Sequence, residues 1–373
     1  MGFFDKSDRL NQVQSMGDVL NRINSIMDWE IFMPVLERIP ATEAKGPGGR
    51  PAFHPMFMFK VLVLQSLYGL SDEQTQYQIL DRRSFHDFLD ITEADTVPDQ
   101  NTIREFREKL TRAQLHEELF AAYAKRLEEK CFITRKGNIV DASFVEVPRQ
   151  RNRRKENESI KRGEVPDAWE QDSKRLSHKD LDARWTKKNQ QTFYGYKNHA
   201  NVDLESKLIV RAEVTDASVH DSQALDSVTC EGDAETWLDA GYVGGACEAV
   251  LAGKGIAAKI CEKGARNRPL TAKQKRSNRT KSRKRCRVEH VFGYMTMNMK
   301  AMVKRYIGMK RNRASIIFCN LVYNMARTEQ IIRLKLLGRR TPSFCLKKLH
   351  SLRYTIKRDA MAHSRCLKTG TQA

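Results

Sequence analysis

The chain has 373 residues, enough for two or three structural units with a substantial core. Its 66 Lys and Arg outnumber its 46 Asp and Glu, and the formal net charge of +20 favours a polyanion as partner. The longest apolar run, residues 55–70, contains Lys60 and Gln65 and is too short to span a bilayer, so we expect no membrane partner. No export leader is recognisable and the cysteines lack metal-ligand spacing, so we expect a cytoplasmic protein with reduced thiols.

The first part of the sequence predicts an all-α domain over residues 1–130. Apolar residues recur at helical spacing between residues 15 and 40, where Pro40 ends the pattern. Residues 41–50 have the glycine, proline and charge content of a linker. Helices are then expected near residues 54–68, 71–82 and 84–89, with a longer one from Thr102.

These short helices are typical of a helix-turn-helix arrangement that serves DNA binding or dimerisation. Ser71 and Gln74 have the spacing of a capping box, and Gly69 is placed to end the preceding helix. Arg104 and Arg107 make one side of the last helix basic. That side fits contact with DNA, and it fits equally well an ordinary solvated face of a helical bundle.

The period changes after residue 136, and the pattern predicts an α/β domain over residues 131–337. Strands are expected at residues 137–147, 199–204, 207–214, 236–240 and 255–262, with helices among the later strands. The polar stretch 149–190 lacks periodicity and is interpreted as an insertion or mobile loop. The order β, β, β, α, β, α, β, α is that of a ribonuclease-H-like mixed sheet with flanking helices. A helix over residues 312–337 is expected to cover the other face of the sheet, and residues 338–373 form a basic tail.

A strongly basic segment precedes the helix that begins near Glu289. Residues 266–287 contain many cations and no acid, which we interpret as a basic loop that binds phosphate. Its candidate DNA-binding residues are Arg279, Lys281, Arg283, Lys284, Arg285 and Arg287. A carboxylate at the edge of such a surface repels the ligand unless a cation lies between them.

Three acids stand out as candidates for holding that cation. Asp141 lies in the middle of the first predicted strand, Asp239 ends the fourth, and Glu289 starts a late helix. Taken singly, each also fits a structural role as a paired core acid, a turn cap or a surface residue. In the proposed topology they converge, and three hard oxygen ligands beside a basic surface favour Mg²⁺ or Mn²⁺, as two ions about 3.5–4 Å apart.

The ordered motifs IVDASFVEVPRQ, YGYKNHANVD, VTDASVHDSQ, WLDAGYVG and RVEHVFGYM resemble the DDE transposases of bacterial insertion sequences, in particular insertion-sequence family five. The resemblance covers about residues 50–335. It implies that Asp141, Asp239 and Glu289 are the catalytic, metal-binding triad. Arg285 matches the family's arginine four residues before the glutamate, whereas Ser282 and Thr296 stand where relatives often have Tyr and Lys. Lys300, one turn further on, is the candidate substitute for that lysine.

The resemblance implies a transposase that cleaves DNA at the terminal inverted repeats of its element and joins the 3′ hydroxyl to target DNA. Because both ends must be held at once, we expect a homodimer on double-stranded DNA, associated with the bacterial nucleoid. Two alternatives remain at this point. One is a structure-specific nuclease of the same fold, and the other is a non-catalytic DNA-binding repressor that descends from a transposase.

Other acids and histidines lie near the triad in sequence. Asp203 is expected to stabilise a hairpin, and Asp221 or Ser218 to cap a helix. His220 is a candidate for orienting a phosphate or a carboxylate. His290 points about 100° away from Glu289 around its helix, so a metal shared by the two is not expected.

Overall fold

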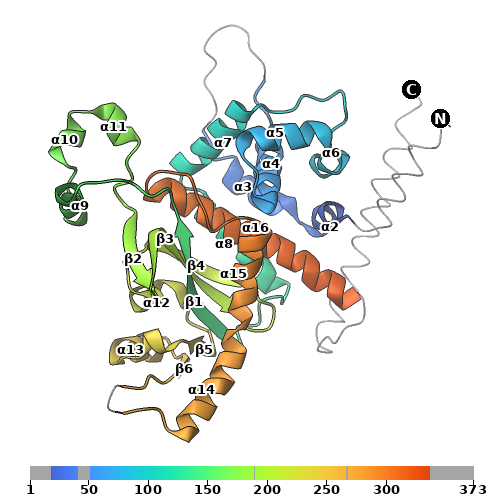
Figure 1. Ribbon diagram of the computed structural model, residues 1–373. Coiled ribbons are helices and arrows are strands. Elements are labelled where there is room, and N and C mark those ends of the chain that lie inside the picture. The colour runs from blue at the N-terminus through green and yellow to red at the C-terminus, as the bar shows by residue number, and fades with distance from the viewer. Residues whose placement is uncertain (1–17, 41–50, 189, 266–267, 337–373) are drawn as a thin grey trace.

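The computed structural model describes residues 18–40, 51–188, 190–265 and 268–336 (Figure 1). Three features expected from the sequence therefore lie outside the described residues: the linker 41–50, the cation Arg266 and the basic tail 338–373.

The amino-terminal part is all-helical, as predicted. Leu20, Phe32 and Leu36, which set the predicted period, are fully buried. Its elements are α2 (Val19–Ile26), η1 (Trp29–Phe32), α3 (Met33–Leu36), α4 (Pro55–Tyr68), α5 (Asp72–Asp81), α6 (Arg83–Leu89), α7 (Gln100–Arg112) and α8 (His116–Glu129). The last of these was not predicted.

The predicted helix boundaries at Gly69 and Ser71 are confirmed. Gly69 ends α4 with a left-handed φ of 59°, and a Cβ there would lie 2.6 Å from the Met299 carbonyl oxygen, so only glycine fits. Ser71 and Gln74 form the reciprocal capping box of α5. These two devices set the sharp turn between α4 and α5 and bring that turn against the carboxyl-terminal half of the chain.

The centre of the molecule is a six-stranded mixed sheet, in agreement with the predicted ribonuclease-H-like fold class. The strand order is β2-β3-β1-β5-β6, and β4 pairs with β3. β1 runs antiparallel to β3 and parallel to β5, which in turn runs parallel to β6. The strands are β1 (Asn138–Glu146), β2 (Arg184–Lys188), β3 (Gln191–Asp203), β4 (Ile209–Asp216), β5 (Glu235–Leu238) and β6 (Ala257–Ile260).

Helices cover both faces of the sheet. On one face, η2 (Asp221–Ala224), α12 (Leu225–Val228), η3 (Ala240–Tyr242) and α13 (Gly245–Gly253) surround a small core that includes Val140 and Leu238. On the other face, α16 (Met309–Leu336) packs on β4 and also contacts α4 and α8 (Figure 1). Its Asn320 exchanges amide hydrogen bonds with Asn198 of β3. One large core therefore joins the helical region to the sheet.

The stretch between β1 and β2 contains three short helices, so of the two interpretations, an insertion or a mobile loop, the mobile loop was wrong. It contains α9 (Arg154–Lys161), α10 (Asp167–Glu170) and α11 (Ser173–Ser177), and it ends in the unpredicted strand β2. Trp169 is fully buried there, and its Nε1 donates a hydrogen bond to Glu156. One large aromatic side chain is enough to order a short polar segment, and composition alone does not reveal it.

The basic stretch before Glu289 is also more ordered than predicted. Instead of a loop it forms α14 (Ala272–Arg285), which α15 (Arg287–Met297) follows after Cys286. Thr271 and Gln274 make a capping box at the start of α14. Lys and Arg are good helix formers, so a run of cations is compatible with a helix when an end is capped.

Candidate active site

The register of β1 and β5 brings two of the predicted acids together. Ile139 and Trp237 are paired directly across these parallel strands, and both belong to the core on the α15 and α16 side. Asp141 and Asp239 each lie two residues further along, and alternate residues of an extended chain share a face. The two carboxylates therefore lie side by side on one face of the sheet, Asp141 within β1 and Asp239 directly after β5.

One arginine bridges the two carboxylates. Nη2 of Arg285 lies 3.3 Å from Asp141 Oδ2 and 4.0 Å from Asp239 Oδ2, although Arg285 and Asp141 are 144 residues apart in the chain. Arg285 ends α14, and its side chain is 18% exposed. Its Nε is buried and has no hydrogen-bond partner among the described residues. The guanidinium is thus only partly satisfied, so it neutralises the pair without fully engaging it.

The remaining hydrogen bonds of the pair are short-range. Asp141 Oδ1 accepts the backbone N–H of the next residue, Ala142, at 2.9 Å. Asp239 Oδ1 accepts the Gly241 N–H at 2.8 Å and so caps η3, as the sequence suggested for its structural alternative. Each carboxylate has its other oxygen directed toward Arg285, which leaves those oxygens available to a ligand that displaces the arginine.

Burial shapes the electrostatics of Asp141. Desolvation is the largest effect and raises the pKa of Asp141 above its usual value, while Arg285 and the Ala142 N–H act in the opposite direction. The negative charge of Asp239 raises the same pKa, and the positive charge of Lys188 lowers it. A buried acid held this way gains from any further cation, because the cation favours the ionised form.

Glu289 does not join this pair. It is in the first turn of α15 and is exposed, and its side chain has no ion pair or hydrogen bond with any residue that the structure describes. Val288 and Val291 instead lie on the buried face of α15. Among described residues, no group of three or more His, Cys, Asp or Glu side chains is close enough to hold a metal. The structure therefore brings together two of the three predicted ligands.

The basic residues of α14 divide into anchored and free side chains. Lys281 donates to the Ile260 carbonyl, and the Lys284 ammonium lies 4.0 Å from the centre of the Trp237 ring. Just after α14, Arg287 donates to the Leu204 carbonyl at 2.6 Å. Arg279 and Arg283 are exposed, with no ion pair to a described residue. Anchored cations fix the helix on the sheet, and the free ones remain available to phosphate.

The predicted basic residues of the helical region are placed differently. Arg107 makes a two-point ion pair with Asp72, at 2.6 and 2.7 Å, and lies over the Tyr306 ring. Arg104 is exposed and contacts Asn101. Lys300 is exposed and lines a cavity of about 600 Å³ between the helical region, the segment that follows α15 and the first half of α16. Of these three cations, Arg107 is committed to a structural contact.

The competing polar residues have structural partners. Asp203 is fully buried in the β3–β4 turn and accepts several hydrogen bonds, which confirms its predicted role in a hairpin. His220, rather than Ser218 or Asp221, caps η2 by accepting the Ser222 N–H. Asp221 instead pairs with Lys197 at 2.9 Å. The capping prediction was wrong because a histidine ring nitrogen took the place expected for a hydroxyl or carboxylate.

Three residues on or around β1 and η3 escaped the sequence reasoning. Tyr242 is buried, and its hydroxyl has no partner among described residues; desolvation raises its pKa, and Asp221, Asp141 and Asp239 add to the rise. Lys197 lies over Phe144 on the opposite face of β1. Lys188 lies on β2, a strand that was not predicted, and its positive charge lowers the pKa of Asp141. Of these three, only Tyr242 could have been noticed in the sequence, since it follows Asp239 by three residues.

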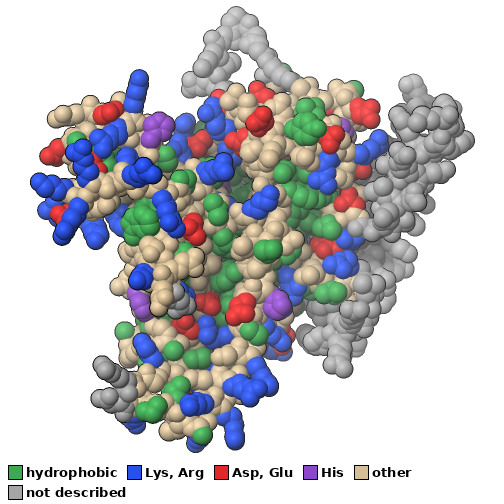
Figure 2. Space-filling view, in the orientation of Figure 1, with side chains coloured by type: hydrophobic (Ala, Val, Ile, Leu, Met, Phe, Trp, Pro, Cys, Tyr) green, Lys and Arg blue, Asp and Glu red, His purple; other side chains and the backbone are tan. Residues whose placement is uncertain are grey.

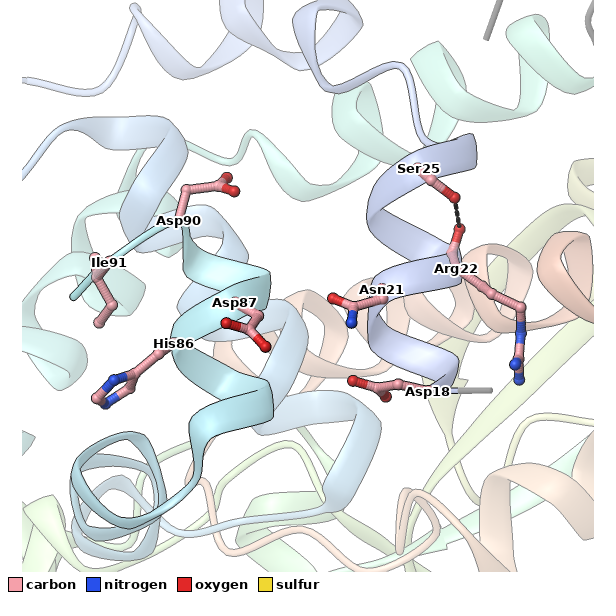
Figure 3. A pocket seen from close by; sticks show the side chains of 8 residues that line it. All are labelled: Asp18, Asn21, Arg22, Ser25, His86, Asp87, Asp90 and Ile91. Atoms are coloured by element: carbon pink, nitrogen blue, oxygen red, sulfur yellow. Dashed lines mark hydrogen bonds between the residues drawn. The ribbon is translucent and has the colours of Figure 1, made fainter. Parts of the chain in front are cut away.

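A separate cavity of about 660 Å³ lies between α2 and α6 (Figure 3). Asp18, Asp87 and Asp90 line it together with Arg22 and His86, and Figure 3 shows these side chains on facing helices. Asp18 caps α2, and Asp90 pairs with Lys60 at 2.7 Å. The cavity is acidic, so it repels a polyanion, and it contains neither Asp141 nor Asp239.

Comparison with known families matches both parts of the chain. Residues 134–325 match the family model described as a transposase DDE domain, which covers more than half of the chain and includes Asp141, Asp239 and Glu289. The chain belongs to the DDE transposase family. Residues 8–109 match a second model, described as a transposase domain, so the helical region belongs to the same kind of protein. No solved structure gives a significant match.

The assignment fits the chemistry of the carboxylate pair. Transposases of this family act on DNA and generally use divalent metal ions. Carboxylate oxygens are the ligands that hard cations prefer, and Arg285 shows that a positive charge is already stabilised between these two. The residues present therefore fit a divalent cation. No helix in the described ranges is long and apolar enough to cross a membrane.

Proposed function

We propose that this transposase cleaves DNA at the ends of its insertion sequence and transfers the exposed 3′ hydroxyl to target DNA. The observation that supports it best is the convergence of Asp141 and Asp239 on one face of the sheet, from positions fixed by strand pairing. Its ordered motifs favour insertion-sequence family five as the subtype. Both steps are in-line displacements at phosphorus, so one carboxylate site serves both.

The proposed ligands of Mg²⁺, or of Mn²⁺ in its place, are Asp141, Asp239 and Glu289. Two bound ions would activate the attacking water or hydroxyl and stabilise the leaving oxygen. Glu289 is included because the ordered motifs resemble those of the family, and because it lies in the first turn of α15, just after the helix whose last residue, Arg285, contacts both aspartates. The chain's contribution is to hold the aspartates at fixed positions and to supply Arg285 as a mobile counter-charge beside them.

Around this site, the free cations of α14 hold the DNA backbone. Arg279 and Arg283 are exposed on the same helix whose last residue touches the carboxylate pair. Lys and Arg side chains neutralise phosphate and release counterions, so binding is expected to weaken steeply with salt. We propose a homodimer on DNA, which would hold both element ends, and a bacterial, nucleoid-associated location. The proposed units are residues 1–130 for end binding and dimerisation and 131–337 for catalysis.

A cleavage and joining assay tests the proposal. The substrate is a labelled duplex that carries the short inverted repeat found in the DNA flanking the coding region, incubated with Mg²⁺ and an unlabelled target plasmid. We expect nicked and joined products from the wild type. Asp141→Asn is expected to remove both products by a factor of at least about 10³, since it removes an interaction that the chemistry requires, while DNA retardation in EDTA stays the same.

The outcomes separate the alternatives. Nicking without joining would favour a nuclease of the same fold. Retardation with neither product from the wild type would favour the DNA-binding repressor. Cleavage by Asp141→Asn at the wild-type rate would contradict the assignment of the site.

A further inference from the structure

The folded insertion has no part in the function proposed above. We call residues 149–188 the insertion lobe. Its helices α9, α10 and α11 surround Trp169, whose Nε1 donates to Glu156 at 3.0 Å. Arg175 donates to the same carboxylate at 2.8 Å, and the Lys179 ammonium lies 4.9 Å from the Trp169 ring centre. The lobe therefore has a defined shape of its own.

The lobe is also fixed to the body of the protein. Asp180 is buried and accepts hydrogen bonds from the Tyr196 hydroxyl at 2.8 Å and from the Gly308 N–H at 3.0 Å. Asp182 accepts the Met309 N–H at 2.7 Å. These contacts tie the base of the lobe to β3 and to the start of α16, so its surface keeps one position relative to the sheet.

Most acids of the insertion lobe pair with other residues of the chain, whereas many of its cations have no paired acid. Glu158 pairs with Arg154, and Glu164 pairs with Arg162. Asp172 caps α11. Within residues 149–188, the acids without a partner are Asp167 and Glu170. More of the cations in this range have neither a paired acid nor a hydrogen bond from the side chain: Arg151, Arg153, Lys155, Lys161, Lys174, Lys187 and Lys188. The outer surface is therefore strongly basic.

This basic surface leads toward the carboxylate pair. Lys188, at the end of the lobe, lies 5.7 Å from the ring of Phe144 on β1, the strand that also carries Asp141. Figure 2 shows Lys and Arg side chains gathered over α9 to α11 and, on the other side of the sheet, over α14. Both basic surfaces are therefore seen on one face of the molecule, and the last residue of α14, Arg285, contacts the carboxylate pair.

The composition of the lobe favours nucleic acid over protein as its partner. Protein interfaces are centred on apolar and aromatic anchors, but Trp169 and Ile160 are buried inside the lobe, and α9 to α11 expose no large apolar side chain. The exposed aromatic of the lobe, Trp185 on β2, packs against Tyr194 and has the Arg149 guanidinium over its ring. Interfaces with nucleic acid are instead polar and positively charged. Lysine and arginine without partner acids are suited to phosphate groups.

We propose that the insertion lobe binds the phosphate backbone of the DNA duplex that carries the scissile phosphate, on the side of the carboxylate pair opposite α14. The proposal rests on the assignment of Asp141 and Asp239 as the cleavage site, because that site sets where the duplex passes. The two basic surfaces then hold the duplex on either side of the bond to be broken.

The test compares two variants of the full chain with the same loss of charge. Lys155→Gln/Lys161→Gln removes two free cations of α9, and Lys136→Gln/Arg211→Gln removes two exposed cations just before β1 and on β4. Both are assayed for binding to the element-end duplex in EDTA over a salt series. The lobe variant is expected to bind roughly tenfold or more weakly at 0.1 M salt, with a salt slope reduced by about 0.9 for each lost phosphate contact. The control is expected to match the wild type.

Three results would overturn the proposal. The first is a lobe variant that binds the element end within twofold of the wild type, and the second is a control variant that loses as much affinity. The third is a loss confined to an unrelated duplex of equal length, which would assign the lobe to target DNA. Because binding is measured in EDTA, it does not depend on cleavage, so failure of the proposed catalytic function would be seen separately in the joining assay.

Discussion

Two acidic sites in the sheet, at the β3–β4 turn and on β1, are built in opposite ways. In the β3–β4 turn, Asp203 is fully buried; it accepts hydrogen bonds from the backbone N–H groups and hydroxyls of Thr134 and Ser206 and from the N–H groups of Arg135 and Glu205. Asp141 and Asp239 instead share one arginine, Arg285, whose guanidinium is only partly hydrogen-bonded. A fully satisfied carboxylate holds a turn together, whereas an under-satisfied one is ready for a ligand.

The largest expected effect is at the satisfied site. Asp203→Ala leaves several buried donors unpaired, so we expect the free energy of unfolding to fall by about 3–5 kcal/mol. Asp203→Asn keeps one acceptor oxygen and should lose clearly less. Urea denaturation of the two variants measures both values. A loss under about 1 kcal/mol for Asp203→Ala would show that the turn does not depend on this carboxylate.

The pH dependence of the free energy of unfolding tests the burial of two histidines. Burial lowers the pKa of His116 from 6.5 to about 4, so the unfolded chain takes up the proton first as the pH falls. Its contribution to stability is present above pH 6.5 and is lost toward pH 4, by about 3 kcal/mol. His199 acts in the same direction. His116→Leu should flatten the decline of unfolding free energy between these pH values, and an unchanged slope would contradict the burial argument.

The bridging arginine gives the next test. Arg285 neutralises the pair that a divalent cation would bind, so Arg285→Gln should tighten Mn²⁺ binding roughly tenfold, or about 1.4 kcal/mol. Arg283→Gln, two residues earlier and exposed, is the matched control and should have little effect. Titration calorimetry without DNA measures the dissociation constants. Weaker binding by Arg285→Gln would mean that the arginine supports the metal rather than competing with it.

The smallest expected effect is at Asp141, where removing the charge should raise the free energy of unfolding, whereas removing the Asp203 carboxylate should lower it. Because desolvation raises its pKa, the folded protein binds the proton more readily than the unfolded chain, so ionised Asp141 destabilises the fold above the raised pKa. Asp141→Asn should therefore raise the metal-free free energy of unfolding at pH 7 by about 1 kcal/mol. The gain should vanish as the pH falls toward 4. Destabilisation at pH 7 would remove the contrast with Asp203.

The sequence predicted the sheet well because its strands are apolar and bounded by turn residues. Residues 137–147 and 236–240 anticipated β1 and β5, and the motif positions placed Asp141 in the middle of the first strand and Asp239 at the end of the fourth. Glycine and serine chemistry predicted the α4–α5 turn for a local reason, the left-handed backbone at Gly69. Local rules succeed where the interaction is local.

The sequence failed where one distant contact decides the structure. The bridge from Arg285 to Asp141 spans 144 residues, and neither hydrophobic period nor capping reveals it. The insertion lobe depends on Trp169, a lone aromatic in a polar segment. α14 was missed although Thr271 and Gln274 gave a readable capping signal, because its cations were interpreted as a loop. Charge indicates a partner, but it does not by itself exclude a helix.

The central claim, that Asp141 and Asp239 together hold a divalent cation, is tested most directly by Mn²⁺ titration of the full-length protein without DNA. The wild type should bind Mn²⁺, both Asp141→Asn and Asp239→Asn should lose at least about tenfold in affinity, equivalent to about 1.4 kcal/mol, and the surface variant Asp226→Asn should bind like the wild type. Equal binding by the wild type and both aspartate variants would contradict the claim.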